Sequence, residues 1–183
     1  MRLVAGFFLL VPSVHAGIYF TAGSGDVNPG GLVTIPITVN YTSGENWLSL
    51  DLTLSWNSSV LTYNSTDLVS PFTTGSGIFN SGTPGVLSFS WANGSGSAVA
   101  DGATIFNLTL SAASGAPLGP QTISFASLPS VGFVTSGEIT ANGTLPGTVT
   151  VVPEPVNYAL AGFACFFIGA KTISWFSRKR VAH

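Results

Sequence analysis

The chain has 183 residues, with five Lys and Arg against seven Asp and Glu, which gives a formal net charge of −2 at pH 7. All five basic residues and both histidines lie before residue 17 or after residue 170, and the single cysteine is Cys165. Residues 17–152 therefore contain no basic side chain and no cysteine, and they carry six carboxylates. This composition excludes from residues 17–152 a disulfide, a histidine or lysine general base, thiolate chemistry, a typical zinc site and attraction to a phosphate backbone.

The first 16 residues predict a secretory signal peptide. Met1 and Arg2 form a short positive segment, residues 3–11 are apolar, and Val14-His15-Ala16 has the small residues of a cleavage site. We therefore expect the secretion machinery to export the chain and cleavage to fall between Ala16 and Gly17. The alternative is that these residues form a buried N-terminal strand or helix.

Residues 17–151 predict one all-β domain, an antiparallel β-sandwich or jelly roll. Apolar and polar residues alternate with a period of two along residues 33–41, 48–56, 87–91 and 106–110, which is typical of strands with one buried face. Two such sheets that face each other make a sandwich. Shorter strands are expected at residues 18–20, 60–63, 78–79, 122–125, 131–134, 138–140 and 148–152.

Three local signals refine this prediction. Pro36 has no N–H to donate to a sheet, so its strand should be an edge or carry a bulge there. Asn93-Gly94 and Asn142-Gly143 are dipeptides that favour tight turns.

The alternation along residues 47–56 separates two kinds of tryptophan. It places Trp56 on the apolar face, and the strand at residues 87–91 likewise places Trp91 in the core. It places Trp47 on the polar face with Asp51. An exposed indole can stack on a sugar ring, so Trp47 and Asp51 are the candidate carbohydrate-binding residues. The alternative is that Trp47 covers one end of the sandwich.

Residues 152–183 combine three signals in a fixed order. The run at 156–176 has 21 residues and as a helix would span ~31 Å, about the thickness of the hydrocarbon core of a membrane, although Lys171 interrupts it. It predicts a transmembrane helix. The motif before the helix consists of Val152, Pro153, Glu154 and Pro155. The basic end after the helix consists of Arg178, Lys179 and Arg180.

This order resembles the PEP-CTERM sorting tail of Gram-negative bacteria. The resemblance implies that a membrane-embedded exosortase recognises residues 152–155 and removes the tail. The protein would then reach the cell surface or the extracellular matrix after transient anchoring in the inner membrane.

The exported part resembles a cohesin, the jelly-roll module of bacterial cellulosomes and related secreted proteins. The resembling segments are residues 29–37, 50–61, 101–110 and 137–149, and Trp56-Asn57-Ser58-Ser59-Val60-Leu61 stands where cohesins usually have Tyr-Asp-x-x-Val-Leu. The resemblance implies about nine strands and a dockerin as partner, with the calcium belonging to the dockerin.

Together these patterns favour an exported, non-enzymatic protein that binds extracellular polysaccharide or a protein partner. One alternative is a cohesin that recruits a dockerin-bearing, polysaccharide-degrading enzyme. Another is a glycosidase, which needs two carboxylates ~5–10 Å apart. The six carboxylates are scattered, so we predict no catalytic residue, cofactor or metal site, while calcium binding in loops stays open.

Overall fold

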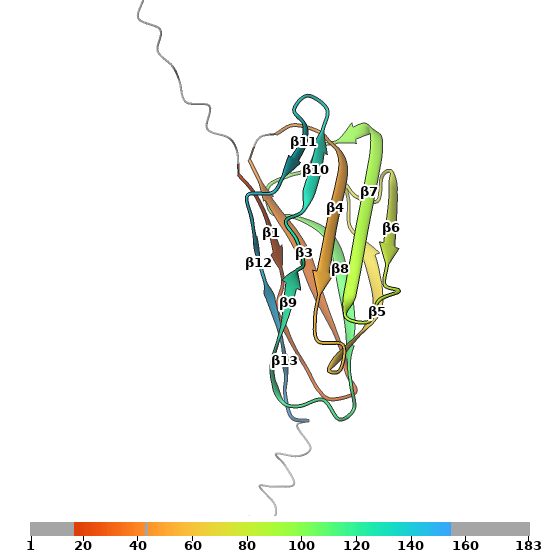
Figure 1. The fold of residues 1–183 in the computed structure, drawn as a ribbon, viewed down its shortest axis with the longest axis vertical. Coiled ribbons are helices and arrows are strands. Elements are labelled where there is room, and N and C mark those ends of the chain that lie inside the picture. The colour runs from red at the N-terminus through yellow and green to blue at the C-terminus, as the bar shows by residue number, and fades with distance from the viewer. Residues whose placement is uncertain (1–16, 43, 155–183) are drawn as a thin grey trace, which may run out of the picture.

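The computed structural model describes residues 17–42 and 44–154, which form two facing β-sheets (Figure 1). The expectation of an all-β sandwich is confirmed, and no helix among the described residues is long and apolar enough to cross a membrane. The predicted signal peptide at residues 1–16, the membrane helix at 156–176 and the basic end at 178–180 lie outside the described residues. The thirteen strands are β1 (Ile18–Ala22), β2 (Gly25–Val27), β3 (Leu32–Tyr41), β4 (Trp47–Ser55), β5 (Leu61–Leu68), β6 (Ser76–Asn80), β7 (Val86–Ser97), β8 (Ala103–Ala112), β9 (Gly119–Phe125), β10 (Ser130–Phe133), β11 (Gly137–Thr140), β12 (Gly143–Leu145) and β13 (Gly147–Val151).

The smaller sheet has five strands in the order β12-β1-β3-β8-β5. The larger sheet has eight, in the order β11-β10-β4-β9-β13-β2, with β7 paired to β4 and β6 paired to β7. The strand count exceeds the nine expected by four, and two of these four arise because the segments near both ends of the domain each divide into two short strands, one in each sheet.

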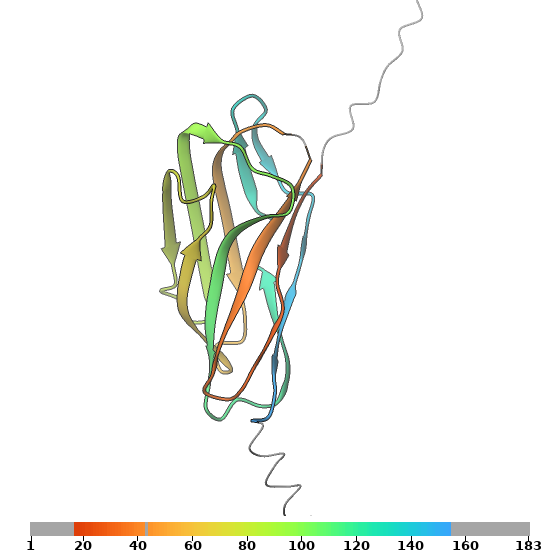
Figure 2. The same ribbon diagram turned by 180° about the vertical axis from the view of Figure 1, so that it is seen from behind.

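Of the eleven strand pairs in the described residues, nine are antiparallel, as expected, and two are parallel. β1 pairs with β12, and β2 pairs with β13, in the same direction. The reason is that both end segments cross from the smaller to the larger sheet side by side. At the crossing the Thr148 N–H donates to Ser24 Oγ (3.0 Å), and a Cβ atom on Gly147 would overlap the carbonyl oxygen of Gly23. The two ends of the domain therefore leave at opposite poles (Figures 1 and 2).

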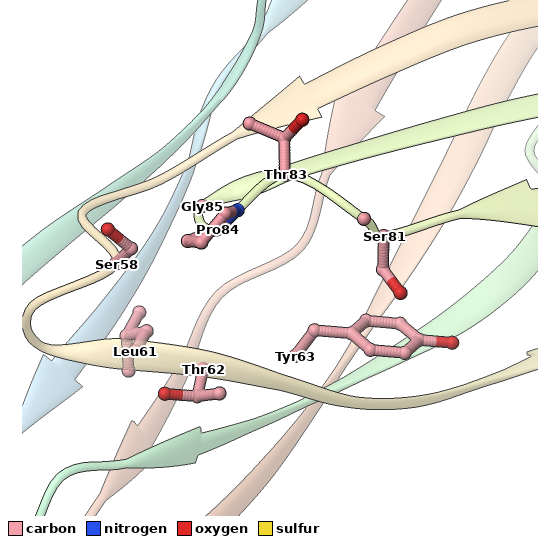
Figure 3. A pocket seen from close by; sticks show the side chains of 9 residues that line it. Ser58, Leu61, Thr62, Tyr63, Ser81, Thr83, Pro84 and Gly85 are labelled. Carbon is pink, nitrogen blue, oxygen red and sulfur yellow. The ribbon is translucent and has the colours of Figure 1, made fainter.

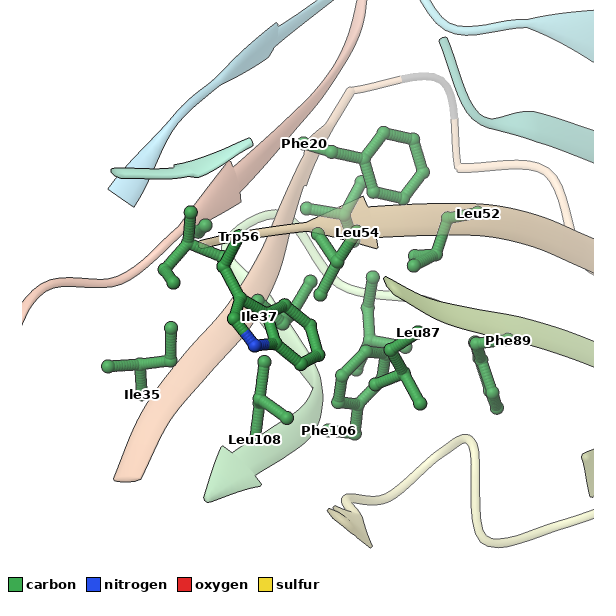
Figure 4. Packing of buried hydrophobic residues seen from close by; sticks show 14 of the residues in the cluster. Phe20, Ile35, Ile37, Leu52, Leu54, Trp56, Leu87, Phe89, Phe106 and Leu108 are labelled. Atoms are coloured by element: carbon green, nitrogen blue, oxygen red, sulfur yellow. The ribbon is translucent and has the colours of Figure 1, made fainter. Parts of the chain in front are cut away.

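The core lies between the sheets and is built by the alternation seen in the sequence. Leucine, isoleucine and phenylalanine side chains from β3, β4, β7 and β8 meet there (Figure 4). Trp56 and Trp91 are buried as expected. The indole N–H of Trp56 donates to the carbonyl oxygen of Leu61, and that of Trp91 to the carbonyl oxygen of Thr74 (both 2.9 Å), so neither buried donor is left unpaired.

The local signals had mixed outcomes. Pro36 lies in β3, an interior strand, and the pairing of β3 with β8 shifts directly after Ile37, so the bulge is confirmed and the edge is not. The predicted turn at Asn93-Gly94 is wrong, because both residues continue β7. Asn142-Gly143 is not a hairpin turn either, because it carries the chain from β11 to β12 in the other sheet.

Candidate functional site

The outer surface of the larger sheet carries a regular array of small polar side chains, which we call the Asp51 face. Cross-strand pairing sets Asp51 directly opposite Ser90 of β7 and opposite Ser130 of β10. The row continues at both ends, and a second row runs beside it. In strand order the two rows are Ile78, Ser90, Asp51, Ser130 and Thr140, and Ser76, Ala92, Ser49, Gly132 and Glu138.

Asp51 is the carboxylate at the centre of this face. Ser90 Oγ donates to Asp51 Oδ1 (2.5 Å), and Ser130 Oγ donates to the Glu138 carboxylate. The Thr53 and Ser88 hydroxyls also pair with each other (3.2 Å). These hydrogen bonds fix the orientation of the carboxylates, and a shallow depression of about 200 Å³ lies over Asp51, Thr53, Ser88, Ser90, Leu128 and Ser130.

The face is chemically suited to a protein surface. Asp51 is exposed, and its carboxylate can accept charge-assisted hydrogen bonds from a partner's N–H, ammonium or guanidinium groups. Two apolar side chains add contact area: Ile78 (68% exposed) at the end of the first row and Leu128 (49% exposed) at the edge of the depression. No side chain of the two rows is aromatic, so the rows offer no ring on which a sugar could stack.

Trp47 does not lie on this face, and the prediction that it is exposed is wrong. Trp47 pairs with Phe133 of β10 and Ser49 pairs with Gly132, so β4 has one residue more than β10 at this point, and the extra residue reverses the alternation at the start of β4. Trp47 is completely buried, with ring centroids 5.3 Å from Tyr41, 5.9 Å from Phe72 and 5.8 Å from Phe133. It cannot stack on a sugar.

The predicted processing residues that the structure describes lie at the two ends of the domain. The Val152 N–H donates to the carbonyl oxygen of Val27 (2.9 Å), Pro153 is half-buried and Glu154 is exposed. Gly17, at the opposite end, directly precedes β1. The remaining predicted processing residues lie outside the described residues: Ala16, Pro155, Arg178, Lys179 and Arg180.

The other carboxylates do not assemble into a recognisable chemical site. In residues 17–42 and 44–154, no three Asp, Glu, His or Cys side chains gather closely enough to hold a metal ion. Glu45 lies in the loop before β4, where Ser136 Oγ donates to both of its carboxylate oxygens (2.7 and 2.8 Å). Hydrogen bonds from Ser136 and Thr135 lower the pKa of Glu45, whereas a glycosidase acid needs a raised pKa.

We expect Ser136→Ala to raise the pKa of Glu45 towards its ordinary value, because the largest cause of the lowering is the Ser136 hydrogen bond. A carboxyl with a lowered folded-state pKa contributes stability above its unfolded-state pKa, and that stability is lost as the pH falls through the folded-state value. The pH dependence from Glu45 should therefore shrink in the variant. NMR titration of the Glu45 carboxyl carbon measures this, with Ser127→Ala as control; an unchanged pKa in Ser136→Ala would contradict it.

Sequence reasoning found part of the Asp51 face. The period-two pattern placed Asp51, Ser49 and Thr53 together on a polar side of one strand, and Ser88 and Ser90 on a polar side of another. The pattern did not predict that Ser130, Thr140 and Ile78 lie in the same row as Asp51. Neighbours across a sheet depend on register, and no signal within one strand specifies it.

Comparison with known proteins identifies the fold. The family model described as "Cohesin domain" matches residues 18–151. A cohesin in a type I cohesin–dockerin complex from Clostridium thermocellum superposes with a TM-score of 0.67 at 15% identity, covering 74% of this chain and 99% of that one. The sixth cohesin of scaffoldin B from Acetivibrio cellulolyticus, in complex with a dockerin, gives 0.66 at 22% identity, with the same coverage.

A non-cellulosomal cohesin from the archaeon Archaeoglobus fulgidus has a TM-score of 0.62 at 15% identity, covering 79% of this chain and 97% of that one. A search of curated proteins by sequence gave no match. Cohesin domains are non-enzymatic protein–protein interaction modules, which agrees with an array of small hydroxyl side chains around one carboxylate. From its match over residues 18–151 and its two-sheet topology, the chain belongs to the cohesin domain family.

Proposed function

We propose that this protein is an exported interaction module whose Asp51 face binds a dockerin-bearing protein. The observation that carries the proposal is the five-strand row centred on Asp51, which presents one oriented carboxylate among small hydroxyl groups on a broad sheet surface. The dockerin complexes of the Clostridium and Acetivibrio cohesins support the identity of the partner. A polysaccharide-degrading enzyme that carries the dockerin would be recruited in this way.

The charge of the domain also bears on the partner. The described residues contain seven carboxylates and no Lys, Arg or His, so a basic or neutral surface would associate most readily. Asp51 is the carboxylate best placed to meet it, because small side chains surround it and let a partner approach closely.

The proposal includes sorting to the cell surface. It rests on the sequence order of the 152–155 motif, the apolar run and the basic end, together with the signal peptide. Exosortase would act where Glu154 is exposed just beyond the last hydrogen-bonded residue, Val152. The domain would then present the Asp51 face outside the cell, either released or re-anchored in the matrix.

Asp51→Asn should weaken binding to a dockerin-bearing protein from the same genome by roughly tenfold or more, because a hydrogen bond to a charged group contributes about 1.5–3 kcal/mol. Asp67→Asn is the matched control, since Asp67 is an exposed carboxylate on β5 of the smaller sheet. Titration calorimetry measures both affinities. Equal losses in the two variants, or a genome that encodes no dockerin, would contradict the proposal.

The sorting proposal makes a separate prediction. The mature protein should begin at Gly17 and end near Pro155, and Glu154→Ala should leave a membrane-held precursor that still contains Arg178. Intact-mass measurement of the secreted and membrane fractions decides this. Glu138→Ala, which removes another exposed carboxylate, should be processed normally. A mature wild-type chain that retains the basic end would refute exosortase processing.

A further inference from the structure

A second site lies on the outer surface of the smaller sheet, where β1 and β12 run side by side (Figure 2). Tyr19 of β1 is 46% exposed, and it is the one exposed aromatic side chain among residues 17–42 and 44–154. The site is separate from the Asp51 face, which lies on the other sheet. It is also separate from a pocket of about 240 Å³ between the start of β5 and the loop that joins β6 to β7 (Figure 3).

Two glycines stand beside the edges of the Tyr19 ring. A Cβ atom on Gly17 would lie 2.6 Å from Tyr19 Cε2 and 3.5 Å from both Cδ2 and Cζ. An atom above the face of the ring, at the same distance from Cε2, would lie closer to those two neighbours. A Cβ atom on Gly143 would lie 3.2 Å from both Cδ1 and Cε1, with no further ring atom within 4 Å. Both Cβ positions are therefore outside the ring and close to its plane.

The Tyr19 ring lies flat on the sheet as a result. Tyr19 pairs with Gly143, so these residues share the outer side of the sheet, and the two-residue period places Gly17 on the same side. The plane of the ring thus passes near three Cβ positions that stand at similar height above the strands. One face of the ring rests on the backbone, and the other faces solvent.

The surface around the ring is neutral and polar. Tyr19 lies between Gly143 of β12 and Asn40 of β3, and the Asn40 side chain is exposed. These side chains point outward, because Phe20 and Val39, which alternate with them, are completely buried. In strand order the neighbouring row is Leu145, Thr21, Thr38 and Thr104. We call these two rows the Tyr19 platform.

The shape and charge of the platform restrict its ligand. A flat ring with one open face stacks best on a flat apolar surface of similar size, and the C–H face of a pyranose is such a surface. The hydroxyl groups at the rim of the sugar can then pair with the Asn40 amide and the Thr21 hydroxyl. The described residues contain seven carboxylates and no basic side chain, so they repel an anionic polymer.

We propose that the Tyr19 platform binds a neutral extracellular polysaccharide, with one pyranose ring stacked on Tyr19. The glycines already hold the aromatic ring in place, so little ordering opposes binding. One stacked sugar gives a dissociation constant on the order of 1 mM, and the repeated sugars of a polymer raise retention. The platform and the Asp51 face lie on opposite sheets, so both surfaces can be occupied at once.

Saturation-transfer NMR on the full chain, purified in a phosphocholine detergent without a sugar headgroup, tests the site. The neutral probes are cellohexaose and chitohexaose, whose β-1,4-linked rings form flat ribbons. Hexagalacturonate is the charged counterpart, and hexaproline tests whether the ring prefers a peptide. We expect transfer to at least one neutral oligosaccharide and clearly less to the other two probes.

Tyr19→Leu should weaken binding about tenfold or more, and Tyr19→Phe should retain it, because the ring remains. The matched control is Tyr63→Leu, which removes a half-buried tyrosine ring at the pocket of Figure 3 and keeps an apolar side chain against the core. It should leave the sugar signal unchanged. Asp51→Asn should also leave it unchanged, so this test is independent of dockerin binding.

Gly17→Ala tests the flat orientation of the ring. The added Cβ atom would overlap Tyr19 Cε2, and the ring is the end of a flexible side chain, so it can swing away at little cost in stability. Sugar binding should weaken severalfold while the melting temperature stays nearly constant. Gly94→Ala is the control, because no heavy atom lies within 4 Å of a Cβ atom built there.

Two kinds of result would overturn the proposal. One is the absence of transfer to both neutral oligosaccharides, or equal transfer to hexagalacturonate or hexaproline. The other is a sugar signal that survives Tyr19→Leu or Gly17→Ala unchanged. Should Tyr19→Leu fail to fold by circular dichroism, Gly17→Ala decides the outcome, since it leaves every core side chain in place.

Discussion

Replacing Trp47 by alanine is expected to lower the free energy of unfolding by about 3–5 kcal/mol, the usual cost of removing a large buried aromatic side chain. Trp47 is completely buried, and the rings of Phe20, Tyr41, Phe72 and Phe133 surround it. Among residues 17–42 and 44–154, no other side chain makes as many aromatic contacts. Urea unfolding followed by circular dichroism measures the loss.

Two further variants sharpen this test. The Trp47 indole N–H is buried without a hydrogen-bond partner in the described residues, so Trp47→Phe removes an unsatisfied donor together with some volume. It should therefore cost clearly less than Trp47→Ala. Tyr19→Ala is the control, since Tyr19 is an aromatic residue of β1 that is 46% exposed, and it should be nearly neutral. Similar small effects of Trp47→Ala and Tyr19→Ala would show that Trp47 is not in the core.

Gly147→Ala should destabilise the domain by at least about 1–3 kcal/mol, the typical cost of overpacking. A Cβ atom there would overlap the Gly23 carbonyl oxygen and lie 2.8 Å from the carbonyl oxygen of Ala22. Both obstacles are backbone atoms of the segment that crosses beside β12 and β13. They cannot move by a change of rotamer, so the two end segments would have to separate.

Gly94→Ala is the matched control for this prediction. Gly94 lies in β7, its φ is not positive, and no heavy atom lies within 4 Å of a Cβ atom built on it. Its replacement should leave the melting temperature nearly unchanged. A melting temperature of Gly147→Ala equal to that of Gly94→Ala would contradict the close approach of the two crossing segments.

Much of the core could be predicted because it depends on local alternation. Leu50, Leu52 and Leu54 lie two residues apart, so an extended chain must place them on one side, and the structure buries all three. The same reasoning placed Trp56 and Trp91 correctly. It failed at Trp47, only three residues before Leu50, because a bulge in β4 against β10 reverses the side on which the preceding residue of the strand lies.

The candidate sites, too, could be predicted only as far as they depend on local alternation. Asp51 could be assigned to a polar strand face, but its neighbours Ser90 and Ser130 come from strands 39 and 79 positions further along the chain, as the register pairs show. The flat Tyr19 ring likewise depends on Gly143, which pairs with Tyr19 across 124 positions of the chain. Neither grouping follows from a periodic pattern, because each depends on how separate segments pair.

The amino-acid sequence by itself determined the all-β class, the apolar face of each main strand and the absence of basic side chains from the described domain. These follow from composition and from a two-residue period, which are local properties. Only the tertiary structure decided that Trp47 is buried, that β1 and β2 run parallel to β12 and β13, and which hydroxyl groups surround Asp51. Those features arise from register, bulges and the packing of chain ends, which are set by long-range pairing of the whole sandwich.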